Sequence, residues 1–140
     1  IAIIVAIYPA VWGIGQLVTG KLSDHYNKKI MLTLGMLLQA IALVAMFYAT
    51  TMPWFIVLAV VLGVGTAIVY PTFLSAMSDY TNPSQRAQSI GVFRFWRDSG
   101  YAFGAIFTIL ISKFYDIELS LIVIGIITFI SAIIIKIRMD

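Results

Sequence analysis

Five apolar runs, each about as long as the hydrocarbon core of a bilayer is thick, make up most of this 140-residue chain. A membrane-spanning helix needs about 20 residues at 1.5 Å each. Measured against that length, the runs predict spans over about 1–20, 30–50, 53–77, 87–112 and 119–137. Short turns rich in Pro, Asn, Ser and Asp separate the runs, and no linker interrupts them. We therefore expect one membrane domain over 1–140, an all-α polytopic bundle of five transmembrane helices.

The composition agrees with a membrane protein and excludes other classes. Hydrophobic residues make up 61% of the chain and charged residues 11%, whereas soluble domains are about half apolar and a quarter charged. Runs such as 30–51 and 119–135 are apolar on all sides, unlike the alternating strands of a β-barrel. The net charge of +3 is small and the bases flank apolar runs. The expected partner is therefore the lipid bilayer, and no nucleic acid is expected.

Catalytic and metal-binding motifs are scarce in this sequence. The chain has no cysteine and one histidine, His25, with no ligand partner near it in the sequence. A phosphate-binding loop is absent as well. An intramembrane enzyme would need a catalytic dyad, and only Asp98 with its neighbouring arginines is available. We therefore predict no enzyme activity, no cofactor and no metal site.

Lysine and arginine residues in the loops and at the ends of the predicted spans lie mainly on one side of the membrane. The loop after 20, the loop before 87 and the C-terminal tail share that side and hold six bases: Lys21, Lys28, Lys29, Arg86, Lys136 and Arg138. The opposite side holds only Lys113. Because short cytoplasmic loops carry the excess of bases, we predict a multi-pass protein of the cell membrane with a cytoplasmic C-terminus.

The runs differ in polar content, and this difference predicts which of them face lipid. Runs 30–50 and 119–137 have no ionisable residue in the middle and few polar ones, such as Gln39. We interpret them as lipid-facing walls. Runs 1–20, 53–77 and 87–112 carry Pro, Gly and polar side chains at membrane depth. We interpret these three as the interior of the protein.

The first run places Tyr8, Trp12 and Gln16 four residues apart, on one face of a helix. Such a stripe lines a wet cavity or packs its polar tips against a neighbouring helix, and the spacing alone does not choose between these.

The third run has Gly63 and Gly65 ahead of Tyr70-Pro71, a pattern typical of a gate or of a static packing kink. Pro71 lacks an N–H, so the carbonyl that it frees must find water or a neighbour.

The fourth run carries Arg94, Arg97 and Asp98 at membrane depth, where charges are costly and are functional candidates by default. The four-residue spacing predicts an Arg94–Asp98 pair and leaves Arg97 in need of another partner. The arginines either snorkel within a structural charge cluster or contact an anionic substrate or proton relay. Gly100 and Gly104 form a GxxxG pair that permits close helix packing. The candidate cavity, substrate or proton residues are Tyr8, Trp12, Gln16, Tyr70, Arg94, Arg97, Asp98 and Tyr101.

Three segments resemble the major facilitator superfamily. The first is its signature loop between spans, here formed by Gly20, Leu22, Asp24, Lys28 and Lys29. This loop departs from the usual pattern with His25 in place of Arg or Lys and Asn27 in place of Gly. The segment 78–86, which ends in Arg86, is similar to the acidic turn two helices later. The segment 91–105 is similar to bacterial and archaeal permeases.

The resemblance implies a secondary transporter that moves a small solute by alternating access, in efflux or uptake, as symporter or antiporter. It implies helices eight to twelve, the C-terminal half, with a missing N-terminal half as partner. Assignment to helices two to six remains the alternative. Asp24, tuned by Arg86 and the nearby lysines, is the expected conformational latch against a helix N-terminus of the partner half. The two arginines at membrane depth favour an anionic solute. The competing function is a receptor or scaffold that kept the fold and lost transport.

Overall fold

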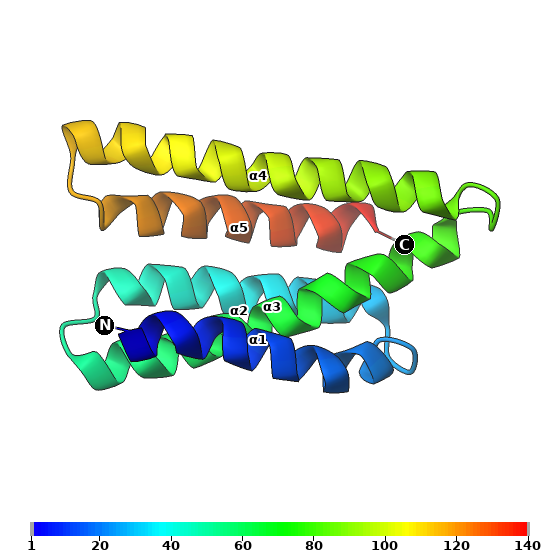
Figure 1. Ribbon diagram of the computed structural model, residues 1–140, viewed down its shortest axis with the longest axis horizontal. Coiled ribbons are helices and arrows are strands. Elements are labelled where there is room, and N and C mark those ends of the chain that lie inside the picture. The colour runs from blue at the N-terminus through cyan, green and yellow to red at the C-terminus, as the bar shows by residue number, and fades with distance from the viewer. Residues whose placement is uncertain (1, 140) are drawn as a thin grey trace.

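The computed structural model describes residues 2–139, and all regular structure among them is helical (Figure 1). The helices are α1 (Ala2–Leu22), α2 (Lys28–Phe47), α3 (Met52–Tyr80), α4 (Arg86–Phe114) and α5 (Leu119–Arg138). These bounds confirm the all-α prediction and lie within three residues of the predicted spans. The loops α1–α2 and α3–α4 and the C-terminus share one end of the bundle, so the six bases gather there.

Among the residues that the structure describes, three helices satisfy both the length and the apolar composition of a membrane span: α2, α3 and α5. Helix α1 has 21 residues and α4 has 29, so both reach the hydrocarbon thickness of about 30 Å at 1.5 Å per residue. The charged cluster around Arg97 makes α4 more polar than the other helices. The chain is therefore a helical membrane bundle, in which α1 and α4 remain predicted spans.

Helix α2 begins two residues earlier than predicted because Asn27 caps it. The Asn27 Oδ1 atom accepts a hydrogen bond of 3.3 Å from the backbone N–H of Ile30. Such caps satisfy one of the unpaired N–H groups of a first turn. Lys28 and Lys29 are therefore helical, and the loop that carries Asp24 is shorter than the sequence pattern predicts.

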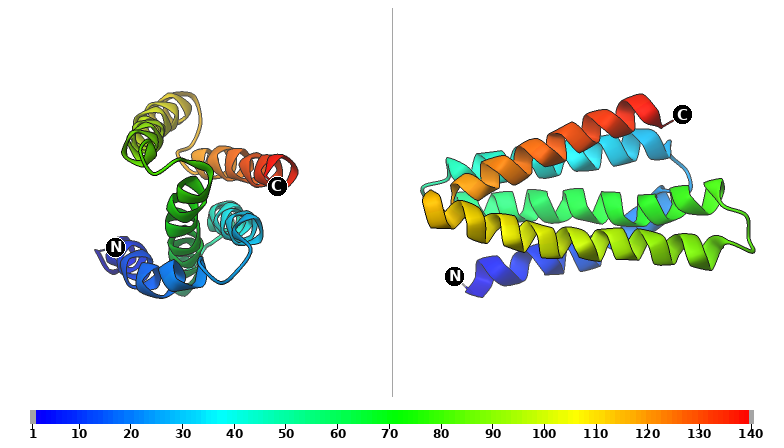
Figure 2. Two further views of the ribbon diagram at one scale, coloured as in Figure 1. Left: turned by 90° about the vertical axis from the view of Figure 1, so that its right-hand side faces the viewer. Right: turned by 90° about the horizontal axis from the view of Figure 1, so that it is seen from above.

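The helices pack unequally, as the end view in Figure 2 shows. Helix α3 packs against α1 and α2, and α2 also packs against α5. Helix α4 contacts α3 and α5 only sparsely, and none of its residues is buried. The interpretation of run 30–50 as a lipid-facing wall is therefore wrong for one side of α2. Its small residues Gly35, Ala40 and Ala42 are buried between neighbouring helices.

Glycines let three of the helix pairs approach closely: α2 with α3, α1 with α3 and, through Gly125 beside the Ala40 carbonyl oxygen, α2 with α5. A Cβ atom built on Gly65 would lie 2.9 Å from the Gly35 carbonyl oxygen, and one on Gly35 would lie 3.1 Å from the Gly65 carbonyl oxygen. Gly63 faces α1 in the same way, with the Tyr8 carbonyl oxygen at 3.0 Å. Gly100 and Gly104, the predicted packing pair, make no such close contact with the other described helices, because a Cβ at either position would meet nothing within 4 Å. Their packing role stays a prediction for a surface outside these helices.

The proline of α3 is compensated by a hydroxyl group from α1. Pro71 cannot donate to the Ala67 carbonyl oxygen one turn earlier. The Thr19 Oγ1 atom donates to that oxygen at 2.5 Å and lies 3.0 Å from the Gly15 carbonyl oxygen. The freed carbonyl has thus found a neighbour, which ties α1 to α3 beside the proline.

Replacing Thr19 by valine is expected to destabilise the protein by about 1–3 kcal/mol, because the Ala67 carbonyl loses its donor in a half-buried, apolar setting. The thermal midpoint of the detergent-solubilised intact protein measures this loss. Thr19→Ser is the matched control, since it keeps the hydroxyl group and should stay near wild type. Equal midpoints for the valine and serine variants would contradict the assignment.

Candidate functional site

A cavity of about 320 Å³ lies between α1, α2, α3 and α4, near the middle of each helix. Helices α3 and α4 supply most of its walls. Its lining residues are Trp12, Gln39, Thr66, Val69, Tyr70, Phe73, Phe93, Trp96, Arg97 and Tyr101. The structure thus brings together four of the predicted cavity residues, from three helices: Trp12, Tyr70, Arg97 and Tyr101.

Aromatic rings connect α1 to α3 on one side of the cavity. The Trp12 ring stacks on Tyr8 with centroids 6.3 Å apart and meets Tyr70 edge-on, also at 6.3 Å. The stripe predicted on run 1–20 therefore faces α3 over Tyr8 and Trp12. Gln16, its third member, is half-buried and does not line this cavity.

Arg97 is the charged group of the cavity. Its NH1 atom donates to the Tyr70 hydroxyl at 2.9 Å, and its guanidinium carbon lies 5.4 Å from the centre of the Tyr70 ring. Its Nε and NH2 atoms both lie 2.8 Å from Oδ1 of Asp98. The predicted Arg94–Asp98 pair is therefore wrong. Arg94 is exposed and has no hydrogen-bond or ion-pair partner within residues 2–139.

Residues four apart on a helix lie only about 40° apart, so the spacing permits an Arg94–Asp98 pair, but Arg97 takes the Asp98 carboxylate instead. Arg97 faces α3, where Tyr70 offers an acceptor, and its long side chain still reaches the neighbouring carboxylate. Arg97 therefore joins a charge cluster with Asp98 and a contact between two helices, and the choice between a structural cluster and a solute contact stays open.

Polar groups that the sequence analysis did not select complete the wall. Gln39 Nε2 donates to Thr66 Oγ1 at 3.2 Å, and the Tyr8 hydroxyl lies 3.3 Å from the same oxygen. Thr66 Oγ1 donates in turn to the Leu62 carbonyl oxygen at 2.9 Å. Gln39 was the available signal, because a polar residue in the middle of an otherwise apolar run tends to face protein and not lipid.

A second polar cluster lies at the end of the bundle that carries the C-terminus. Lys28 forms an ion pair with Asp79 and lies 3.4 Å from the Ser75 carbonyl oxygen. Ser75 Oγ donates to Oδ1 of Asp24 at 3.5 Å. Lys28, which the sequence analysis expected beside Asp24, thus pairs with Asp79 instead. Asp79 lies on α3 because this helix extends three residues beyond its predicted end.

A model of the Major Facilitator Superfamily matches residues 1–139. The chain belongs to this superfamily. Its members are membrane transporters, so the expectation of a transporter is confirmed at that level, and an enzyme family is not indicated. Searches of curated proteins and of solved structures returned no match to this chain.

The signature loop of this superfamily chain is held by local hydrogen bonds. Ser23 is buried, and its Oγ atom donates to the Gly20 carbonyl oxygen at 2.8 Å. Leu22 and Lys29 are half-buried, whereas Asp24 is exposed beyond the end of α1. Arg86 donates to the Ser78 carbonyl oxygen at 3.4 Å and so closes the α3–α4 turn. The loop therefore leaves the Asp24 side chain exposed, with Ser75 of α3 as its hydrogen-bond donor.

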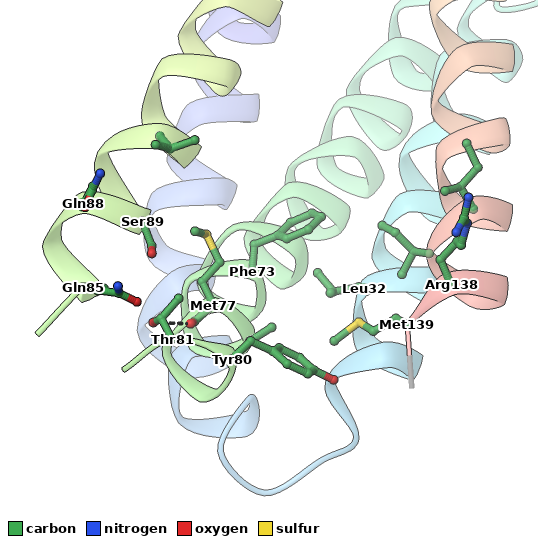
Figure 3. A pocket seen from close by; sticks show the side chains of 14 residues that line it. Leu32, Phe73, Met77, Tyr80, Thr81, Gln85, Gln88, Ser89, Arg138 and Met139 are labelled. Carbon is green, nitrogen blue, oxygen red and sulfur yellow. Dashed lines mark hydrogen bonds between the residues drawn. The ribbon is translucent and has the colours of Figure 1, made fainter. Parts of the chain in front are cut away.

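A larger groove of about 850 Å³ opens at the same end, between α3, α4 and α5 (Figure 3). Phe73 and Met77 of α3 form part of its floor, with Gln85 and Gln88 on the α4 side and Arg138 on the α5 side. The groove follows the sparse contact between α4 and the other helices. The smaller cavity is the candidate site, because among residues 2–139 it brings a charge, hydroxyl groups and an amide together near the middle of the helices.

A metal centre is not indicated in the part of the chain that the structure describes. Among residues 2–139, no three His, Asp or Glu side chains lie close enough together to hold a metal ion.

Proposed function

We propose that this chain is part of a secondary transporter that moves a small, anionic solute by alternating access. The observation that carries the proposal is the contact between Arg97 and Tyr70 in the cavity at mid-helix depth. Transporters of this general architecture bind solutes near the bilayer midplane, between helices that rock about the site. Arg97 supplies the charge and donor groups that suit an anion.

The cost of placing Arg97 in the membrane supports a functional role. Insertion scales assign about 2.5–3.5 kcal/mol to an arginine at the centre of a helix. Asp98 and Tyr70 offset part of that cost, but the Arg97 side chain keeps 30% of its surface exposed. A buried structural ion pair would be more completely enclosed by its neighbours. The exposed part of Arg97 remains available to a solute in the cavity.

We assign the end with the C-terminus to the cytoplasm of a cell-membrane protein. Six of the seven bases in the loops and at the ends of the predicted spans lie at that end, and Lys113 lies at the other. This distribution follows the positive-inside rule.

The remaining helices of the transporter are the proposed partner. The face of α4 that carries Gly100 and Gly104 is open in this chain, and a second helix would fill it. In line with the resemblance, we assign the chain to helices eight to twelve of a transporter. The proposed partner is then the N-terminal half together with the first helix of the C-terminal half.

The Asp24 loop is the proposed conformational switch. The exposed carboxylate would bind the positive N-terminus of a partner helix in one access state, a contact of up to about 1 kcal/mol or roughly fivefold in the equilibrium. Ser75 orients Asp24, and the Lys28–Asp79 pair holds α2 against α3 beside it.

Replacing Asp24 by asparagine in the intact protein is expected to slow transport severalfold and to change the labelling of cysteines introduced into the cytoplasmic side of the cavity. Asp116→Asn is the matched control, because Asp116 is also exposed but lies at the other end of the bundle. Unchanged flux and unchanged labelling in the Asp24 variant would show that Asp24 is not a conformational switch.

Flux measurements test the proposal as a whole. The intact protein is reconstituted in vesicles after a thermal-shift screen of solutes, since a ligand that binds the folded state raises its stability. Saturable flux of a stabilising anion is the expected result. Stabilisation without flux would instead support the receptor or scaffold alternative.

A further inference from the structure

We infer that the groove between α3, α4 and α5 binds one phospholipid with an anionic headgroup, taken from the leaflet on the side of the C-terminus. The inference goes beyond transport and needs only that the chain is a bundle of membrane helices. An acyl chain lies along the apolar floor of the groove, and Arg138 and Lys29 bind the phosphate group. Three features support it: the depth of the groove, two bases at its mouth and a wall that belongs to a lipid-facing helix.

The groove runs from the helix ends into the apolar part of the bundle (Figure 3). Tyr80 ends α3 and Arg138 ends α5, and both lie just beyond the predicted spans, at the level where lipid headgroups begin. Phe73 lies about two turns before Tyr80 on α3, which places it roughly 10 Å deeper. The groove therefore combines a polar mouth with an apolar floor, as an amphipathic lipid requires. Its volume of about 850 Å³ leaves room for a long chain.

A second hollow, lined by charged side chains, adjoins the mouth of the groove. It has a volume of about 440 Å³, and Tyr80 and Met139 line both spaces. Lys29 lines the hollow, whereas Arg138, the residue before Met139, lines the groove. The Met139 backbone N–H donates to the Ile135 carbonyl oxygen at 3.0 Å, which holds the last turn of α5 in place. The two bases thus flank one boundary, and a phosphate group there lies within reach of both.

Arg138 and Lys29 supply the charge that an anionic headgroup needs. Arg138 is exposed and Lys29 is half-buried, so both side chains are accessible. Neither has a side-chain hydrogen bond or ion pair among residues 2–139. Asp79, the acid that lines the hollow, is paired with Lys28, so its repulsion of an anion is offset. Basic pockets between membrane helices on the cytoplasmic side are typical sites for anionic headgroups.

The wall formed by α5 favours a lipid over a protein segment as the occupant. Ile134 lines the groove and is 54% exposed, and the sequence predicts that run 119–137 faces lipid. Ile130 and Ile137 lie on the same face of α5 and are also exposed. The wall of the groove therefore continues into the apolar outer surface of α5. An acyl chain enters along this surface without leaving apolar surroundings.

Native mass spectrometry of the detergent-solubilised intact protein tests the headgroup site. We expect dioleoyl phosphatidylglycerol to bind at least fivefold more tightly than dioleoyl phosphatidylcholine, which has the same chains and no net charge. Arg138→Gln and Lys29→Gln should each weaken phosphatidylglycerol about fivefold, the effect typical of one base near a lipid surface, and leave phosphatidylcholine unchanged. Lys113→Gln is the matched control, because Lys113 lies at the other end of the bundle.

Val92→Trp tests the acyl-chain site. Val92 lines the groove from α4 and is 51% exposed, so an indole there fills the groove without entering a packed core. It should weaken both lipids at least fivefold while the thermal midpoint without lipid stays unchanged. Val57→Trp is the control, because Val57 is equally exposed on α3 and does not line the groove.

Three outcomes would overturn the inference. The first is equal affinity for the two lipids. The second is an equal loss of phosphatidylglycerol binding in the Arg138 and Lys113 variants. The third is a lowered midpoint in Val92→Trp with unchanged lipid binding, which would show that another segment of the intact protein fills the groove. None of these measurements depends on flux, so the inference and the proposed transport function fail or stand separately.

Discussion

Replacing Gly65 by leucine is expected to prevent α2 and α3 from packing and to reduce the yield of folded protein to near zero. Even a Cβ atom at this position would lie 2.9 Å from both the Gly35 carbonyl oxygen and the Gln39 Cγ atom. Overpacking of this kind costs about 1–3 kcal/mol, and a leucine adds three further carbon atoms against a backbone that cannot move aside. The amount of monodisperse protein in size-exclusion chromatography measures the effect.

Gly65→Ala should have a smaller effect of the same sign, with a lowered thermal midpoint and a reduced yield. Gly13→Leu is the matched control, because Gly13 lies within α1 and a Cβ there meets nothing within 4 Å. The close approach of α2 and α3 would be refuted if the leucine variants at positions 65 and 13 gave equal yields.

Replacing Arg97 by glutamine is expected to reduce solute flux at least tenfold while the protein still inserts and folds. The variant loses the charge and most of the donors that face Tyr70 and Asp98, and charge-assisted hydrogen bonds are about twice as strong as neutral ones. Folding should be retained because no residue of α4 is buried in this chain. Counterflow in vesicles, at matched amounts of reconstituted protein, measures the loss.

Arg94→Gln is the matched control for this prediction. Arg94 is the same residue type one turn away on α4, but it is exposed and does not line the cavity. Its substitution should change flux less than twofold. If the two variants lost flux equally, the arginines would act as a general charge cluster and the cavity would not be the binding site.

Much of the candidate site was predictable from the sequence because its members are chemically unusual for their surroundings. Tyr8, Trp12, Tyr70 and Arg97 stand out as polar or charged groups in apolar runs, and lipid gives such groups a strong reason to face protein. Gln39 carries the same signal. The average apolar character of run 30–50 nevertheless predicts a lipid-facing helix, because it outweighs the single polar residue.

The partners of these residues were less predictable. The Arg94–Asp98 pair follows from spacing within one helix, yet Asp98 pairs with Arg97, which also bonds Tyr70 of another helix. Lys28 likewise pairs with Asp79, which lies 51 residues away in sequence. Local rules describe neighbours on one helix, whereas these partners depend on how two helices are rotated about their axes.

The sequence by itself determined that the chain is a bundle of membrane helices and, to within three residues, where the helices begin and end. The reason is that lipid offers the backbone no hydrogen bonds, so each apolar run must satisfy its own N–H and C=O groups as a helix. Only the tertiary structure decided which glycines are contacts, that α4 stands apart and which side chain meets Arg97. Those features depend on how each helix is rotated about its axis and how closely two helices approach. The contact between Gly35 and Gly65 fixes this for α2 and α3, and the spacing of residues along one helix does not predict it.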